Sequence, residues 1–264
     1  MYGSKDESHP NNNTDKDKFY IFDWCNNFEY FSVHANGAMP VVVKSLTERL
    51  FSLRLDIAFA LQDAAHQEIE TDKQLHDELK ILLHKQMESL SMARIDVRDK
   101  IDVVEPFRSM EAWTYLSEVD VAKLNSVASL LPRPNENEAA KKFDILMLYL
   151  QLAQVDSTVN AGKSRESVMA IATLLEKKAT IPLVKAHLDT IKEVQTVQFW
   201  EMQTLDRLER VRKELRELVH LIAEGKNDRS FVINIDDAIT REGNAPTIKL
   251  KATYQQRVVE YLAE

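Results

Sequence analysis

Apolar positions recur with a helical period along most of this 264-residue chain, over residues 40–196 and again over residues 204–224. The first series steps by three and four residues, which is the spacing that keeps side chains on one face of an α-helix. Its members are Leu46, Leu50, Leu53, Ile57 and Leu61. We therefore predict an amphipathic helix that begins near Pro40, a residue well suited to a first helical turn.

Capping residues and prolines predict the limits of the next helices. Residues 71–74 have the capping-box pattern and should begin a helix whose buried side is Leu75, Leu79, Leu82 and Leu83. Ser109 can cap a short helix that holds Met110, Trp113 and Leu116. The other predicted helices span residues 93–104, 119–131, 138–156, 164–178 and 182–196.

Residues 204–224 have the most regular helical pattern in the chain. Their apolar stripe is Leu205, Leu208, Val211, Leu215, Leu218 and Ile222. On the exposed side we expect the oppositely charged pairs Asp206/Arg210, Glu209/Lys213 and Lys213/Glu217. Because the arginines and lysines of this helix are offset by acids, a DNA-contacting helix is not favoured.

An aromatic segment precedes the helices. Residues 19–31 (FYIFDWCNNFEYF) are predicted to form a strand, and both faces of residues 19–25 are apolar apart from Asp23. A strand that is apolar on both faces belongs inside a covered, usually parallel, sheet. Because no parallel partner strand follows, we expect an orphan strand and a chain that is the tail of a longer protein.

The apolar period changes from 3.6 to 2 after Gly225. Residues 231–235 (FVINI) and 247–251 (TIKLK) are predicted to be short strands, and residues 253–262 a last helix. The predicted fold class is therefore mainly α: a multi-helix bundle with a short N-terminal orphan strand and a small mixed α/β C-terminal tail.

The composition of the chain argues against several classes of function. The net charge of −8 argues against a protein-wide field for nucleic acid, and residues 46–78 alone carry eight acids against three bases. The single cysteine, Cys25, suits a reducing cytosol, so a cytoplasmic location is expected. Neither a signal peptide nor an apolar run long enough to span a membrane is found in the sequence. With only five glycines, the chain is poor in the residue that phosphate-binding loops need.

The tripeptide Gly162-Lys163-Ser164 matches the end of a phosphate-binding loop. The full motif needs a glycine at the position of Ser157 and a strand before the loop. We interpret Gly162 instead as a helix C-cap and Ser164 as the cap of the next helix.

Four other groups of residues could carry metal or nucleophile chemistry. Glu78/Lys80 and Glu176/Lys178 match the E-x-K fragment of metal-dependent nucleases but lie inside helical patterns, where they are ordinary surface charges. His66 with Glu70 and Asp63 could supply metal ligands, although a solvated helix face explains them better. Asp236-Asp237 is interpreted as a turn or cap, and Cys25 as a core residue. No catalytic, cofactor-binding or metal residue is therefore predicted.

Both ends of the chain resemble one family. Residues 18–31 (KFYIFDWCNNFEYF) resemble the closing strand of the second motor lobe in the restriction subunits of type I restriction–modification enzymes. Residues 204–239 (TLDRLERVRKELRELVHLI…FVINIDDAI) are similar to the C-terminal signature of the same subunits. The helical stretch between them agrees in character, for example in residues 106–113 (PFRSMEAW).

The resemblance implies a function for the parent protein. Such subunits carry a nuclease domain, two ATP-driven motor lobes and a helical C-terminal region, and they join a methyltransferase core with a specificity subunit to translocate and cleave DNA. The catalytic residues, ATP and Mg²⁺ would all belong to domains upstream of Met1. The implied regions are a flexible segment 1–17, a remnant strand of the second motor lobe 18–36, a helical domain 37–200 and a C-terminal assembly region 201–264.

The expected partners are the methyltransferase and specificity subunits, the motor domains of the same subunit and, through the assembled complex, duplex DNA; no membrane is expected. Two alternatives stay open. An independent helical protein–protein adaptor would explain the bundle but not the orphan strand. A weak DNA-binding helical module would use the modest excess of bases in residues 141–193.

Overall fold

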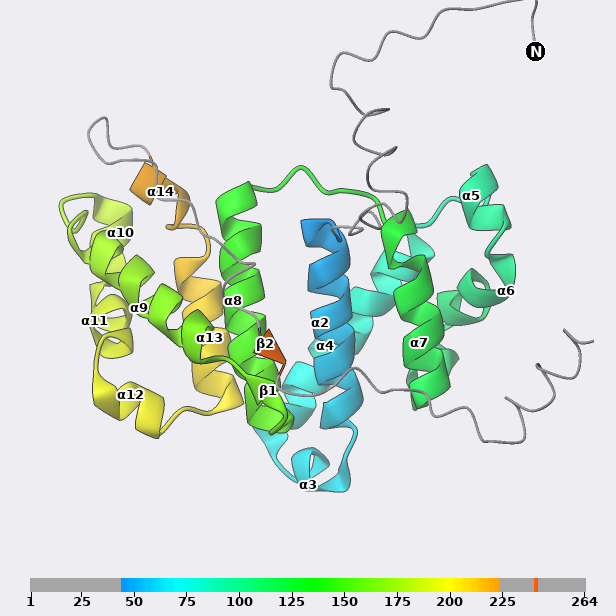
Figure 1. Cartoon of the computed structure of the whole chain (residues 1–264), viewed down its shortest axis with the longest axis horizontal. Coiled ribbons are helices and arrows are strands. Elements are labelled where there is room, and N and C mark those ends of the chain that lie inside the picture. Colours follow the sequence, from blue (N-terminus) through cyan, green and yellow to red (C-terminus); the bar gives the residue numbers. More distant parts are fainter. Residues whose placement is uncertain (1–43, 224–239, 242–264) are drawn as a thin grey trace, which may run out of the picture. The chain divides into compact units, whose positions relative to one another are not determined.

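The computed structural model describes residues 44–223 and 240–241, and this part of the chain is mainly helical, as predicted (Figure 1). The α-helices are α2 (Leu46–Leu61), α3 (Ala64–Gln67), α4 (Glu70–Glu88), α5 (Ile95–Arg98), α6 (Ile101–Val104), α7 (Glu118–Val127), α8 (Glu138–Val155), α9 (Gly162–Glu176), α10 (Pro182–Ala186), α11 (Leu188–Val194), α12 (Val197–Glu201), α13 (Leu205–Leu215) and α14 (His220–Ala223). Three 3-10 helices are η1 (Pro106–Arg108), η2 (Met110–Trp113) and η3 (Ala128–Leu130). The orphan strand, the two C-terminal strands and the last helix, all predictions from the sequence, lie outside the described residues.

Helix α8 is the centre of the fold. It packs against α2 on one side and against α9 and α13 on the other (Figure 1). Side chains all around it are buried, which is the property of a helix enclosed by its neighbours rather than of a surface helix. Although α8 is apolar, no helix in the described part of the chain is both long enough and apolar enough to cross a bilayer.

Two of the packed helices begin with a complete capping box. At α2 the Ser45 hydroxyl accepts the Glu48 backbone N–H, and the Glu48 carboxylate accepts the Ser45 N–H. Ser117 and Asp120 exchange the same two hydrogen bonds at the start of α7. Each box satisfies backbone donors that the first helical turn leaves without partners.

The predicted capping box at residues 71–74 is wrong. Helix α4 begins one residue before Thr71, at Glu70, and its N-cap Ile69 makes no side-chain hydrogen bond. The short helix α3 ends just upstream, so the close turn between α3 and α4 sets the start of α4. Leu75, Leu79 and Leu83 are buried as predicted, whereas Leu82 is 38% exposed.

Three helices predicted as continuous are broken in the structure. Residues 93–104 form the single turns α5 and α6, because only Val97 and Val104 are buried while Ile95 and Ile101 stay exposed. Residues 182–196 divide at His187 into α10 and α11.

The third break falls within residues 204–224, where α13 ends at Leu215. Residues 216–219, which include the buried Leu218 and Val219, form a turn rather than a continuation of the helix. The chain therefore turns before it forms α14. Thr204 is the N-cap of α13, and its hydroxyl accepts the Arg207 backbone N–H.

Two tryptophans fix connecting segments to the core. Trp113, in η2, donates its indole N–H to the Phe107 carbonyl at 2.9 Å and packs edge-on against the Phe107 ring. Trp200, in α12, donates to the Val194 carbonyl at 2.8 Å and packs edge-on against Phe199. Both indoles are thus buried with their polar atom satisfied.

Ser109 caps η2 as predicted, although Met110 is exposed.

The difference between the observed and predicted caps can be tested by substitution. We expect Ser117→Ala to lower the free energy of unfolding by about 1 kcal/mol, because it removes the N-cap hydrogen bond of α7. Thr71→Ala should change it by less than about 0.5 kcal/mol, because Thr71 is an exposed residue within α4. Urea unfolding of both variants measures the two values, and an equal cost at both positions would contradict the observed start of α4.

Candidate functional site

A buried carboxylate lies in the middle of the most apolar helix. Asp144 is on α8, has 0% exposure, and has Phe143 and Ile145, both also fully buried, as its neighbours in sequence. Removing a carboxylate from water costs several kcal/mol unless other groups replace its hydration. The surroundings of Asp144 therefore decide whether α8 can pack at all.

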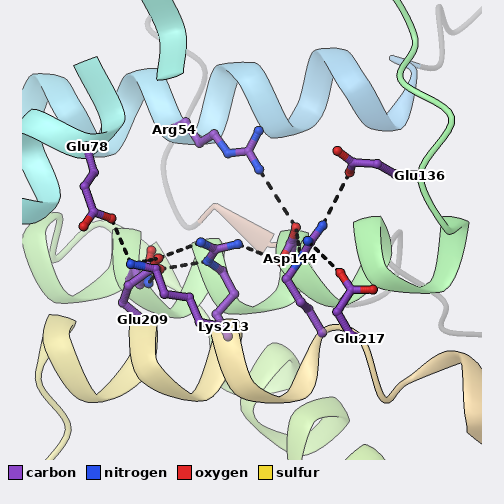
Figure 2. Close-up of polar contacts among 10 residues, drawn as sticks. Arg54, Glu78, Glu136, Asp144, Glu209, Lys213 and Glu217 are labelled. Atoms are coloured by element: carbon purple, nitrogen blue, oxygen red, sulfur yellow. Dashed lines mark hydrogen bonds and ion pairs between the residues drawn. The ribbon is translucent and has the colours of Figure 1, made fainter. Parts of the chain in front are cut away.

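Three arginines surround Asp144 (Figure 2). From α13, Arg212 Nη1 lies 3.0 Å from Asp144 Oδ1. Arg216 Nε, at the C-terminal end of α13, lies 3.2 Å from Asp144 Oδ2. From α2, Arg54 Nη2 lies 3.9 Å from the same oxygen. Asp144 thus ties the central helix to helices on both of its sides.

A second buried carboxylate extends this contact along α13. Glu209 accepts two hydrogen bonds from Arg212, from Nε at 2.8 Å and from Nη2 at 2.6 Å, in the two-pronged geometry that arginine favours. It also accepts a hydrogen bond from the side-chain amide of Gln151 at 2.8 Å. Gln151 lies about two turns along α8 from Asp144. We call Arg54, Asp144, Glu209, Arg212 and Arg216 the ionic cluster.

Burial and charge act in opposite directions on the ionic cluster. Burial tends to raise the pKa of Glu209, but the hydrogen bonds and charge of Arg212 outweigh it and the pKa is lowered. Burial tends to lower the pKa of Arg212, but Glu209 and Asp144 outweigh it and the pKa is raised. For Arg54 burial prevails and the pKa is lowered despite Asp144. The charge of Arg212 is therefore better compensated than that of Arg54.

Exposed residues form further ion pairs at the edge of the ionic cluster. Lys213 Nζ reaches Glu78 of α4 at 2.9 Å and Glu209 at 3.5 Å. Arg216 Nη2 lies 3.4 Å from Glu136, which belongs to the segment before α8. Exposed ion pairs of this kind contribute little stability individually, so the buried members determine the energetics.

The surface pairs predicted on α13 are largely replaced by contacts with other helices. Arg210 pairs with Glu193 of α11 at 2.7 Å rather than with Asp206. Glu209 is buried, so its pair with Lys213 lies at the edge of the ionic cluster and not on an exposed face. The predicted pairing of Lys213 with Glu217 is replaced by the pairs of Lys213 with Glu78 and of Arg216 with Glu217.

Gly162-Lys163-Ser164 does not have the predicted capping roles. Asp156, not Gly162, is the C-cap of α8. A two-residue strand, β1 (Val159–Asn160), separates α8 from α9 and pairs antiparallel with β2 (Thr240–Arg241). Gly162 is the first residue of α9, and Ser164 is fully buried within it, with no hydrogen-bond partner for its hydroxyl.

The two E-x-K fragments do not converge on a common point. Glu78 pairs with Lys213, whereas Lys80 pairs with Asp77 at 2.8 Å. Glu176 accepts the side-chain amide of Gln195 at 2.9 Å. Glu78, Lys80 and Glu176 therefore each pair with a residue outside their own E-x-K fragment.

The expected grouping of His66 and Glu70 on one helix face is wrong, because they belong to separate helices, α3 and α4. His66 Nδ1 lies 2.8 Å from Asp72, and the Asp63 side chain caps α3. Within residues 44–223 and 240–241 no three His, Cys, Asp or Glu side chains are placed to hold a metal ion. Cys25 and Asp236-Asp237 lie outside the described residues.

A second polar group occupies the corner between α3 and α4. His76, on α4, is almost fully buried, and Gln67 bridges its Nδ1, at 2.9 Å, to the Leu61 carbonyl at the end of α2. Burial, and the charge of Lys80, lower the pKa of His76 to about 4. The imidazole is therefore neutral at pH 7 and serves as a packed hydrogen-bonding group.

The helical pattern of residues 138–156 did not mark Asp144 as a buried charge. The signal that could have found it is a carboxylate inside the apolar run of α8, with the polar residue Gln151 seven positions later on the same helix face. The ionic cluster consists of carboxylates and guanidinium groups that pair with one another. Its arrangement holds helices α2, α8 and α13 together.

A comparison with protein-family models, with curated proteins and with solved structures finds no significant match to this chain.

Substitution of Asp144 should reveal how strongly the cluster supports the fold. We expect Asp144→Asn to lower the free energy of unfolding by about 3–5 kcal/mol, because three partly buried arginines lose their shared counter-ion. The same change at the exposed Asp99 should cost less than about 0.5 kcal/mol. Urea denaturation followed by circular dichroism compares the two, and similar values would show that the cluster is dispensable.

His76 predicts a pH dependence of stability. Its pKa is about 4 in the folded chain and about 6.5 in the unfolded chain, so between these values the unfolded chain binds more protons. The stabilisation is complete above pH 6.5 and is lost as the pH falls towards 4, by about 2–3 kcal/mol at pH 4.5. His76→Gln should remove this part of the slope in denaturation curves between pH 7.5 and 4.5. An unchanged slope would show that His76 does not titrate in this way.

Proposed function

We propose that this chain is the non-catalytic, helical C-terminal region of the restriction subunit of a type I restriction–modification enzyme. In this role it packs against the DNA-translocating motor and docks it to the methyltransferase and specificity core in the cytoplasm. The parent subunit would carry out ATP-dependent DNA translocation and endonucleolytic cleavage with residues upstream of this chain. The region itself would bind neither ATP nor Mg²⁺.

The resemblance of the two ends to such subunits is the origin of the proposal. Part of the C-terminal match is described: the charged amphipathic helix expected after Thr204 corresponds to α13, which Thr204 caps. The long helical stretch expected between the two matches corresponds to α2 through α12. These correspondences support the proposal at the level of architecture.

The observation that favours a mechanical role is the attachment of α13. Asp144 of α8 pairs with Arg212 of α13 and lies near Arg54 of α2, so the ionic cluster joins α13 to α8 and, through α8, to α2. The pair of Lys213 with Glu78 joins α13 to α4. Its apolar stripe, including Leu208 and Val211, belongs to the same hydrophobic core as these helices. A partner docked next to α13 would therefore be coupled to the whole helical unit, as an element that links a motor to a stationary core must be.

A DNA-binding role is the second candidate, because several exposed lysines on α9–α11 have no carboxylate within ion-pair distance in the described chain. They are Lys163, Lys177, Lys185 and Lys192. Such lysines could contact phosphates, and the resulting affinity for duplex DNA would fall steeply with salt. Nearby acids, among them Asp189, limit the positive field, so this role is the weaker of the two.

A pull-down tests the docking role. We expect the 264-residue chain to retain a methyltransferase–specificity core from the same restriction system, and a chain truncated after Gly225 to lose at least about tenfold in affinity. This truncation leaves α13 and the ionic cluster in place, so the truncated chain should still unfold cooperatively in urea. Equal retention by both chains would place the docking surface elsewhere, and no retention by either would refute the proposal.

A further inference from the structure

We draw no further inference here: the strongest candidate, the group of exposed apolar side chains between α5 and the start of α7 (Ile95, Ile101, Met110, Tyr115 and Val119), carries none because nothing in the part of the chain that the structure describes shows what covers them.

Discussion

The burial of the Asp144 carboxylate inside α8 is the constraint on which the rest of this structure depends. Helix α8 is enclosed by α2, α9 and α13, so the carboxylate cannot reach water and must be compensated by protein groups. Arg212 and Arg216 supply the close contacts, and Arg54 supplies a more distant one. The position of α13 is therefore fixed by charge as well as by apolar packing.

A buried ion pair is not in itself evidence of high stability, because apolar residues of similar size often stabilise a core as well or better. It does, however, restrict how helices can pack. An arrangement that moved α13 away from Asp144 would leave a buried carboxylate without its arginines, whereas a purely apolar contact would tolerate small rotations. We infer that the cluster specifies one orientation of α13 on α8, which is useful in an element proposed to transmit force.

The sequence predicted most helices and several of their limits, because local signals determine them. The stripe that begins at Leu46, the cap at Ser109 and the span of α8 all follow from nearest-neighbour chemistry. The errors occur where packing competes with the local pattern. Residues 71–74 have the sequence of a capping box, but Thr71 lies inside α4. The apolar pattern after Thr204 stays regular as far as Ile222, although residues 216–219, with the buried Leu218 and Val219, form a turn. Of the candidate site, the helices that carry Arg54, Asp144 and Arg212 were predicted, but the contacts between them were not.

By itself, the sequence determined that the chain is mainly helical and poor in the glycines of phosphate-binding loops, since both follow from composition and periodicity. It also predicted apolar stripes for α2, α4 and α13, and most of the residues in these stripes are buried. Only the tertiary structure decided that Asp144 is an ionic centre, that Glu209 is buried, and that Arg54 approaches Asp144 from a helix about 90 residues earlier in the chain. The physical reason is that a charge becomes costly only when other segments exclude water from it, and no local pattern records which segments those are.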